Sequence, residues 1–202
     1  MDGSLFYWIL WSLWVYLTFI MNKQHPLRFG MSACILVIII LSDVHFTVGG
    51  YQVLASGVFT LVLSYIILGK EKNGVLLYAI ICSVIVTISY VTFRLFEIFD
   101  PVWIIFPKIW MMSIGLLFLG ILLQNTLKRR LLIIICGTMH GEICYAFFLN
   151  RFQFSYPIGA LPYLDICVLA TMLLLVWSFL ENAGTILQNQ FRFPHKGKQK
   201  ST

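Results

Sequence analysis

The residues best placed to do chemistry are His140 and Glu142, which lie inside an apolar run at residues 131–149. Nineteen residues in a row of this composition are long enough to cross the hydrocarbon core of a bilayer as a helix. A charged side chain near the middle of such a helix costs roughly 2.5–3.5 kcal/mol on insertion scales. Glu142 must therefore be paired, protonated or exposed to a wet cavity.

A second acid, Asp165, lies in the next apolar run, at residues 158–179. Glu142 precedes the end of its run by seven residues, and Asp165 follows the start of its own run by seven. At 1.5 Å per residue both carboxylates are about 10 Å below the same membrane surface if the two helices are antiparallel neighbours. Other charged residues reach similar depths, which predicts one polar cluster in the outer half of the helix bundle. Its candidate members are Asp43, Arg94, Glu97, Lys108, His140, Glu142 and Asp165.

Two functions from different classes fit such a cluster. In the first, the cluster lines a pocket that binds a small polar molecule from the outer side or relays protons, as in a small transporter-like or ligand-sensing protein. In the second, the protein is a structural or assembly partner, and the paired charges only fix the rotation and neighbours of the helices. A third hypothesis, an enzyme acting on lipid-linked substrates, would require a cavity that opens sideways to lipid beside Glu142.

The familiar catalytic motifs are absent from the sequence. His140 and Glu142 do not form the HExxH zinc motif, no GxSxG elbow occurs, and residues 158–179 contain no lysine that could form a retinal Schiff base. Cys136, His140 and Cys144 recur every four residues on one helical stripe, but three ligands on one straight helix cannot surround a metal ion. We therefore predict no catalytic residue, cofactor or metal, and no enzymatic activity.

The glycines beside this stripe favour a packing role instead. Gly137 and Gly141 form a small-xxx-small pair, which lets a neighbouring helix approach closely.

The composition indicates an integral membrane protein. Of the 202 residues, 60% are hydrophobic and only 11% charged, with a mean hydropathy of +0.90, whereas soluble domains carry about 25% charged residues. The net charge of +6 is spread over short loops, which favours a role in membrane orientation and gives no indication of a nucleic-acid partner. The five cysteines all fall in apolar runs, so we expect no disulfides. The lipid bilayer is the one partner that the composition implies.

The apolar runs predict an all-α bundle with about seven spans in one domain, residues 1–190, followed by a basic cytoplasmic tail, residues 191–202. Asp100 and Pro101 form a typical helix start, so the fifth span is predicted to begin at Pro101, with a kink at Pro107. The predicted spans are residues 5–21, 31–48, 51–68, 75–93, 101–123, 131–149 and 158–179.

The basic residues predict the orientation of these spans. With the N-terminus outside, 11 of the 14 Lys and Arg residues fall on the inner side, and only Arg94, Lys108 and Arg151 fall outside. Positive residues accumulate on the cytoplasmic side of membrane proteins, so this split favours seven spans with the N-terminus out and the C-terminus in. The alternative is six spans, with one of the weaker runs lying in the membrane interface.

Several short patterns are shared with a known family. They are Phe6-Tyr7-Trp8 with Trp11 and Trp14, Leu95-Phe96-Glu97 followed by Asp100-Pro101-Val102-Trp103, Gly141-Glu142, and Leu164-Asp165-Ile166. Across nearly its whole length the chain resembles the YphA-type membrane proteins of endospore-forming bacilli. The resemblance implies a multi-pass protein of a bacterial plasma membrane, and it supplies no catalytic residues to carry over.

Overall fold

The protein is a bundle of helices with one small hairpin of strands. The computed structural model describes residues 3–26, 28–100, 102 and 104–191, with side chains as far as residue 184. The bundle confirms the predicted all-α class, apart from the hairpin. In chain order the elements are α1 (Ser4–Val15), which continues as the π-helix η1 (Tyr16–Ile20), α2 (Arg28–Leu41), β1 (His45–Val48), β2 (Tyr51–Leu54), α3 (Ala55–Leu68), α4 (Asn73–Phe99), α5 (Lys108–Leu123), α6 (Leu127–Asn150) and α7 (Leu161–Phe191).

Three of the described helices are long and apolar enough to cross a membrane: α4, α6 and the Leu161–Gly184 part of α7. The other four apolar helices have 10–17 residues each. Three candidate spans are thus supported by length and composition among the described residues, and the predicted number of seven spans stays a prediction.

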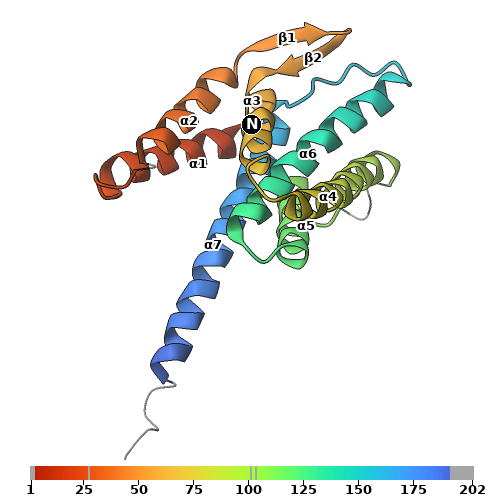
Figure 1. Cartoon of the computed structure of the whole chain (residues 1–202). Helices are drawn as coiled ribbons and strands as arrows, with labels where there is room; N and C mark the ends of the chain where they lie inside the picture. The colour runs from red at the N-terminus through yellow and green to blue at the C-terminus, as the bar shows by residue number, and fades with distance from the viewer. Residues whose placement is uncertain (1–2, 27, 101, 103, 192–202) are drawn as a thin grey trace, which may run out of the picture.

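Helix α6 lies at the centre of the bundle (Figure 1). It packs mainly against α4, and also against α7, α3 and α5, whereas α5 and α1 pack mainly against α7. In α6, 61% of the most apolar window is buried, compared with 28% in α4 and 39% in α7. Large apolar side chains point outward from most of the other helices, as expected for helices surrounded by lipid.

The structure corrects the boundaries of the second and third predicted spans. Helix α2 ends at Leu41, and residues 45–54 form an antiparallel hairpin in which Val48 pairs with Tyr51. Gly49 and Gly50 occupy its two-residue turn with φ of 57° and 86°. Positive φ at both central residues is what a type I′ turn requires, so the two glycines close a hairpin here. The hairpin and the C-terminal end of α7 lie at opposite ends of the molecule (Figure 1).

The predicted helix from Pro101 to Leu123 is also wrong at its start. Helix α4 runs on to Phe99, and α5 begins only at Lys108, with Pro107 preceding it instead of kinking it. Asp100 accepts a hydrogen bond from the Val102 nitrogen at 3.3 Å, an Asx-type turn that competes with helix capping. Pro101 itself lies outside the described residues, as does most of the predicted basic tail.

Candidate functional site

Glu142 lies on the buried side of α6 and is completely enclosed, with no exposed surface. One carboxylate oxygen, Oε1, accepts hydrogen bonds from the hydroxyl of Tyr90 on α4 and from the hydroxyl of Tyr156, the latter at 3.1 Å. The other, Oε2, accepts a bond of 3.4 Å from the backbone nitrogen of Gly159. The buried acid is therefore satisfied by groups from two different parts of the chain.

Arg94 supplies the positive charge nearest to Glu142. Its Nη2 lies 3.8 Å from Glu142 Oε1 and donates to the Tyr156 hydroxyl at 2.5 Å. The guanidinium carbon also lies 4.9 Å from the centre of the Tyr145 ring and 5.6 Å from that of Tyr156, distances typical of cation–π contacts. Aromatic rings and hydroxyls thus take the place of water around this buried cation.

The charges continue outward from Arg94. Its Nη1 contacts Glu97 Oε2 at 3.1 Å, and Glu97 Oε1 contacts Lys108 Nζ at 2.9 Å. The Lys108 side chain is 49% exposed, that of Glu97 19% and that of Glu142 0%. Glu142, Arg94, Glu97 and Lys108 therefore form a chain of alternating charges, the charge ladder, which leads from the core to the surface. Its formal charges cancel if all four groups are ionised.

Four of the seven residues predicted for the polar cluster are brought together in this ladder, and three are not. His140 pairs with the hydroxyl of Tyr65 on α3. Asp43 is exposed on the link between α2 and β1. Asp165 is buried, but it accepts hydrogen bonds from the backbone of Gly3 and Phe6 at the start of α1. Equal depth in the membrane was therefore insufficient to bring Asp165 to Glu142.

The tyrosines were missed by the sequence reasoning, which considered only charged residues and histidine. Tyr90 precedes Arg94 by four residues and thus lies on the same face of α4. That spacing is the one signal in the sequence that pointed to Tyr90. Tyr145 follows Glu142 by three residues and thus shares its face of α6, which is a signal of the same kind. Nothing local indicated Tyr156, because the α6–α7 link meets α4 only through the fold.

Gly137 and Gly141 of α6 bring α4 close to the ladder. A Cβ atom at Gly137 would lie 2.6 Å from Val86 and 2.8 Å from the backbone oxygen of Ser83, and one at Gly141 would lie 2.6 Å from Tyr90. The expected role of these glycines in close helix packing is confirmed. In the described part of the chain, no group of three or more His, Cys, Asp and Glu residues could hold a metal ion, and Cys34, Cys82, Cys136, Cys144 and Cys167 are all free.

A polar pocket of about 140 Å³ lies between the β1–β2 hairpin and the link from α6 to α7. Tyr156 is part of its wall, and its hydroxyl contacts both Arg94 and Glu142. The pocket is lined by Gly50, Tyr51, Gln52, Asn150, Gln153, Phe154, Ser155 and Tyr156, none of which carries a charge. This pocket, hereafter the hairpin pocket, is thus connected to the charge ladder through one side chain.

Comparison with known proteins agrees with the membrane character of the fold. The family model described as "YphA-like integral membrane protein" matches residues 2–200. A relative from Bacillus subtilis (strain 168), named "Uncharacterized protein YphA", is 26% identical over 200 residues, which cover 99% of each chain. No solved structure matches. The chain therefore belongs to the YphA-like family of integral membrane proteins.

Proposed function

We propose that the protein crosses the bacterial plasma membrane seven times, with its N-terminus outside and its C-terminus inside. The distribution of Lys and Arg supports this orientation. Arg94 and Lys108, assigned to the outer side, meet through Glu97, whereas Lys128 and Arg129, assigned to the inner side, meet at Glu71. The four shorter helices would require local thinning of the bilayer, which costs fractions of a kcal/mol per Å of mismatch.

Reporter fusions test this orientation. A reporter enzyme that is active only outside the cytoplasm should be silent when fused after Thr202 and active when inserted between Gly49 and Gly50. An active C-terminal fusion would reject seven spans and favour the six-span alternative.

Within this topology we infer that the protein senses a small, uncharged polar molecule through the hairpin pocket. The observation that carries this proposal is the double role of Tyr156, which lines the pocket and contacts both buried charges of the ladder. A ligand that contacts the Tyr156 ring or hydroxyl alters the bonds that hold Arg94 and Glu142. Binding would thereby change the packing of α4 against α6, and the proposal assigns no catalytic step.

The lining of the pocket indicates the class of ligand. Gln52, Asn150 and Gln153 carry amide groups that can both donate and accept hydrogen bonds, and Ser155 adds a hydroxyl. Burying an ion there without a counter-charge would be costly, so a polyol or another neutral molecule rich in hydroxyl groups suits the site best. The volume of about 140 Å³ limits the ligand to a small one.

The binding test uses the full chain in detergent with glycerol, erythritol, threitol and glucose as probes. A ligand should raise the unfolding temperature in a saturable manner. Ser155→Trp places a large ring in the pocket and should abolish the rise, whereas Arg151→Trp, which adds the same ring at an exposed position outside the pocket, should preserve it. An equal loss in both variants, or no saturable rise with any probe, would reject a binding role for the pocket.

A structural role is the second candidate, and one observation favours it. Glu142 is wholly enclosed and both of its carboxylate oxygens are hydrogen-bonded, as expected for a lock between helices. Tyr156→Phe separates the two candidates because it removes only the hydroxyl. A lower unfolding temperature with an unchanged ligand response favours the lock, and a weakened ligand response in a stable variant favours sensing.

A further inference from the structure

A second pocket lies between the end of the first helix and α2, far from the charge ladder in sequence and on the side of the membrane assigned as inner. Its volume is about 340 Å³. Three of the side chains that line it are basic or can become so, and none is acidic. The lining consists of Trp14, Thr18, Lys23, His25, Arg28, Phe29, Ser32 and Leu36. We call it the basic pocket.

The π-helix η1 shapes one wall of the basic pocket. It is the last turn of the helix, Tyr16–Ile20, and contains Thr18. The last carbonyls of a helix have no partner within the helix and can accept hydrogen bonds from elsewhere. Arg28 donates from Nε to the Leu17 oxygen at 2.8 Å and from Nη2 to the Thr18 oxygen. The guanidinium is therefore fixed across the end of the helix, with its positive charge at the pocket.

In the part of the chain that the structure describes, neither Lys23 nor Arg28 forms a salt bridge. The basic residues at the start of α6 differ in this respect, because Lys128 and Arg129 both contact Glu71, and Arg130 contacts Glu181. The basic pocket thus carries positive charge without a described counter-ion.

Two buried hydrogen-bond donors at the basic pocket lack an acceptor among the described residues. Trp14 Nε1 and Thr18 Oγ1 are both enclosed, and neither has a hydrogen-bond partner among the described residues. Buried donors of this kind are rare because they lose their bonds to water without replacement. Both residues line the same pocket, and a small turn of each side chain would bring its donor to an acceptor bound there.

We propose that the basic pocket binds a phosphate group. A phosphate offers several strong acceptor oxygens to the Trp14 and Thr18 donors, and its negative charge complements Lys23 and Arg28. The anionic headgroups of the cytoplasmic leaflet and free phosphate are the two sources of this chemistry.

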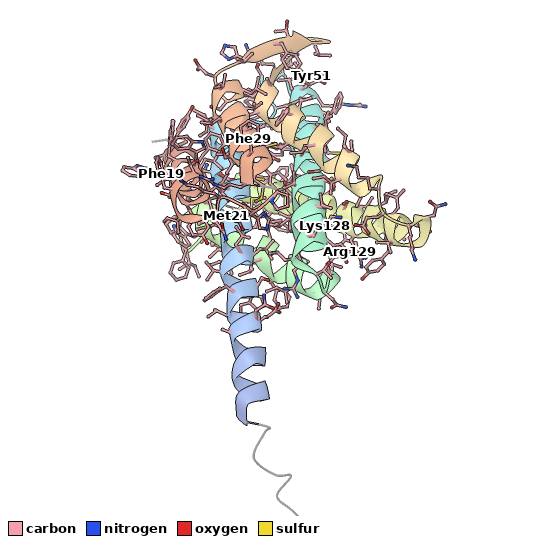
Figure 2. All side chains as sticks on the ribbon, turned by 60° about the vertical axis from the view of Figure 1, so that its left-hand side comes forward. Phe19, Met21, Phe29, Tyr51, Lys128 and Arg129 are labelled. Atoms are coloured by element: carbon pink, nitrogen blue, oxygen red, sulfur yellow. The ribbon has the colours of Figure 1, made fainter. Side chains whose placement is uncertain are left out.

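The side chains around the basic pocket suit a lipid phosphate at the membrane surface. Phe19 and Phe29 are 73% and 84% exposed, and Figure 2 shows both on the α1–α2 side of the molecule, away from Lys128 and Arg129. Apolar side chains such as Phe bury themselves at the boundary between headgroups and acyl chains when a helix lies at the membrane surface. A lipid could place its phosphate in the basic pocket and its chains beside these rings.

The experiment measures the unfolding temperature of the full chain in dodecyl maltoside as dodecyl phosphate or inorganic phosphate is added. We expect a saturable rise with dodecyl phosphate, whereas the same addition of dodecyl maltoside should have no effect. A comparable rise with inorganic phosphate identifies free phosphate as sufficient, and a rise with dodecyl phosphate alone identifies a lipid headgroup.

Three variants assign the effect to the basic pocket. Thr18→Val removes one donor with little change of shape, Trp14→Phe removes the other together with one ring of the indole, and Lys23→Gln removes a charge. Each should weaken the apparent affinity about tenfold, the usual order of effect for losing one hydrogen bond to a charged group. Two different donor variants are used so that one remains informative if the other does not fold.

The matched control is Lys70→Gln, which removes an exposed lysine from the loop between α3 and α4. It should keep the affinity of the unmodified chain. The proposal is overturned if neither phosphate probe gives a saturable rise, if the pocket variants bind as tightly as the unmodified chain, or if Lys70→Gln weakens binding as much as Lys23→Gln, which would indicate general charge attraction.

Discussion

The carboxylate of Asp165 on α7 accepts a hydrogen bond of 2.7 Å from the backbone nitrogen of Gly3, at the opposite end of the chain. Its second oxygen accepts another, of 2.8 Å, from the nitrogen of Phe6. The first turns of a helix have backbone donors without partners and the positive end of the helix dipole, so a buried carboxylate is favourable there. Asp165 thus ties the start of α1 to α7.

Asp165→Asn should therefore destabilise the protein by about 1–3 kcal/mol, because an amide has one acceptor oxygen and one of the two backbone donors would lose its partner. The measurement is the free energy of unfolding in detergent. Asp100→Asn, in an exposed turn, is the matched control and should change stability by less than about 0.5 kcal/mol. Equal effects of the two substitutions would contradict the capping role.

Arg94 and Glu142 should be strongly coupled. Arg94→Met leaves Glu142 buried without its counter-charge, at a cost of about 3–5 kcal/mol. Glu142→Gln should cost less, because Arg94 keeps its contact with Glu97, and the double variant should cost less than the sum of the two. The partly exposed pair Arg129 and Glu71, 3.6 Å apart, provides the control cycle, with an expected coupling of about 0–1 kcal/mol. Additive effects of Arg94→Met and Glu142→Gln would show that the two charges do not interact.

Gly137 should not accept any side chain. Its added Cβ would overlap Val86 and the backbone oxygen of Ser83, so Gly137→Ala should separate α4 from α6 and destabilise the protein by about 1–3 kcal/mol. Gly115 is the control, because a Cβ there would meet nothing within 4 Å. Gly115→Ala should leave stability unchanged or raise it by up to about 1 kcal/mol, since alanine favours the helix. Thermal unfolding that does not distinguish the two variants would reject the close contact.

Glu71, in the loop between α3 and α4, should make stability depend on pH. Its hydrogen bond to Lys128, together with the nearby charges of Lys128 and Arg129, lowers the pKa of the Glu71 carboxyl below its usual value. A carboxyl whose pKa is lower in the folded state contributes stability above its unfolded pKa and loses it as the pH falls through its folded pKa.

The difference in unfolding temperature between the unmodified chain and Glu71→Gln should accordingly be present at pH 7 and disappear in acid. Asp43→Asn, at another exposed loop position, serves as the control. A difference for Glu71→Gln that stays constant from pH 7 into acid would exclude the ion pair as its cause.

The sequence by itself determined the membrane character, the helical class and the importance of α6. These properties follow from hydropathy and from the periodicity of one helix, which are local features. The same local reasoning identified Gly137 and Gly141 as a close-packing site. The resemblance carried by Phe6-Tyr7-Trp8 and Gly141-Glu142 led to the correct family.

The sequence also contained a signal for the hairpin that the span assignment overlooked. Two glycines between short segments rich in β-branched and aromatic residues are typical of a hairpin, as at residues 45–54. The apolar character of the flanking residues led both segments to be assigned to helices. Asp100 and Pro101 misled the prediction in a similar way. They are a good local start for a helix, but the side chain of Asp100 forms an Asx-type turn instead.

Only the tertiary structure decided which charges meet. The position of a residue along its helix predicts only its depth in the membrane. Whether two charged side chains meet also depends on how each helix is rotated about its axis and on which helices are neighbours. For that reason Glu142 faces Arg94 and two tyrosines, while Asp165, at the depth predicted for Glu142, faces the start of α1. The tertiary structure also decided that Trp14 and Thr18 share one pocket with Lys23 and Arg28. This grouping arises because α2 packs back against η1.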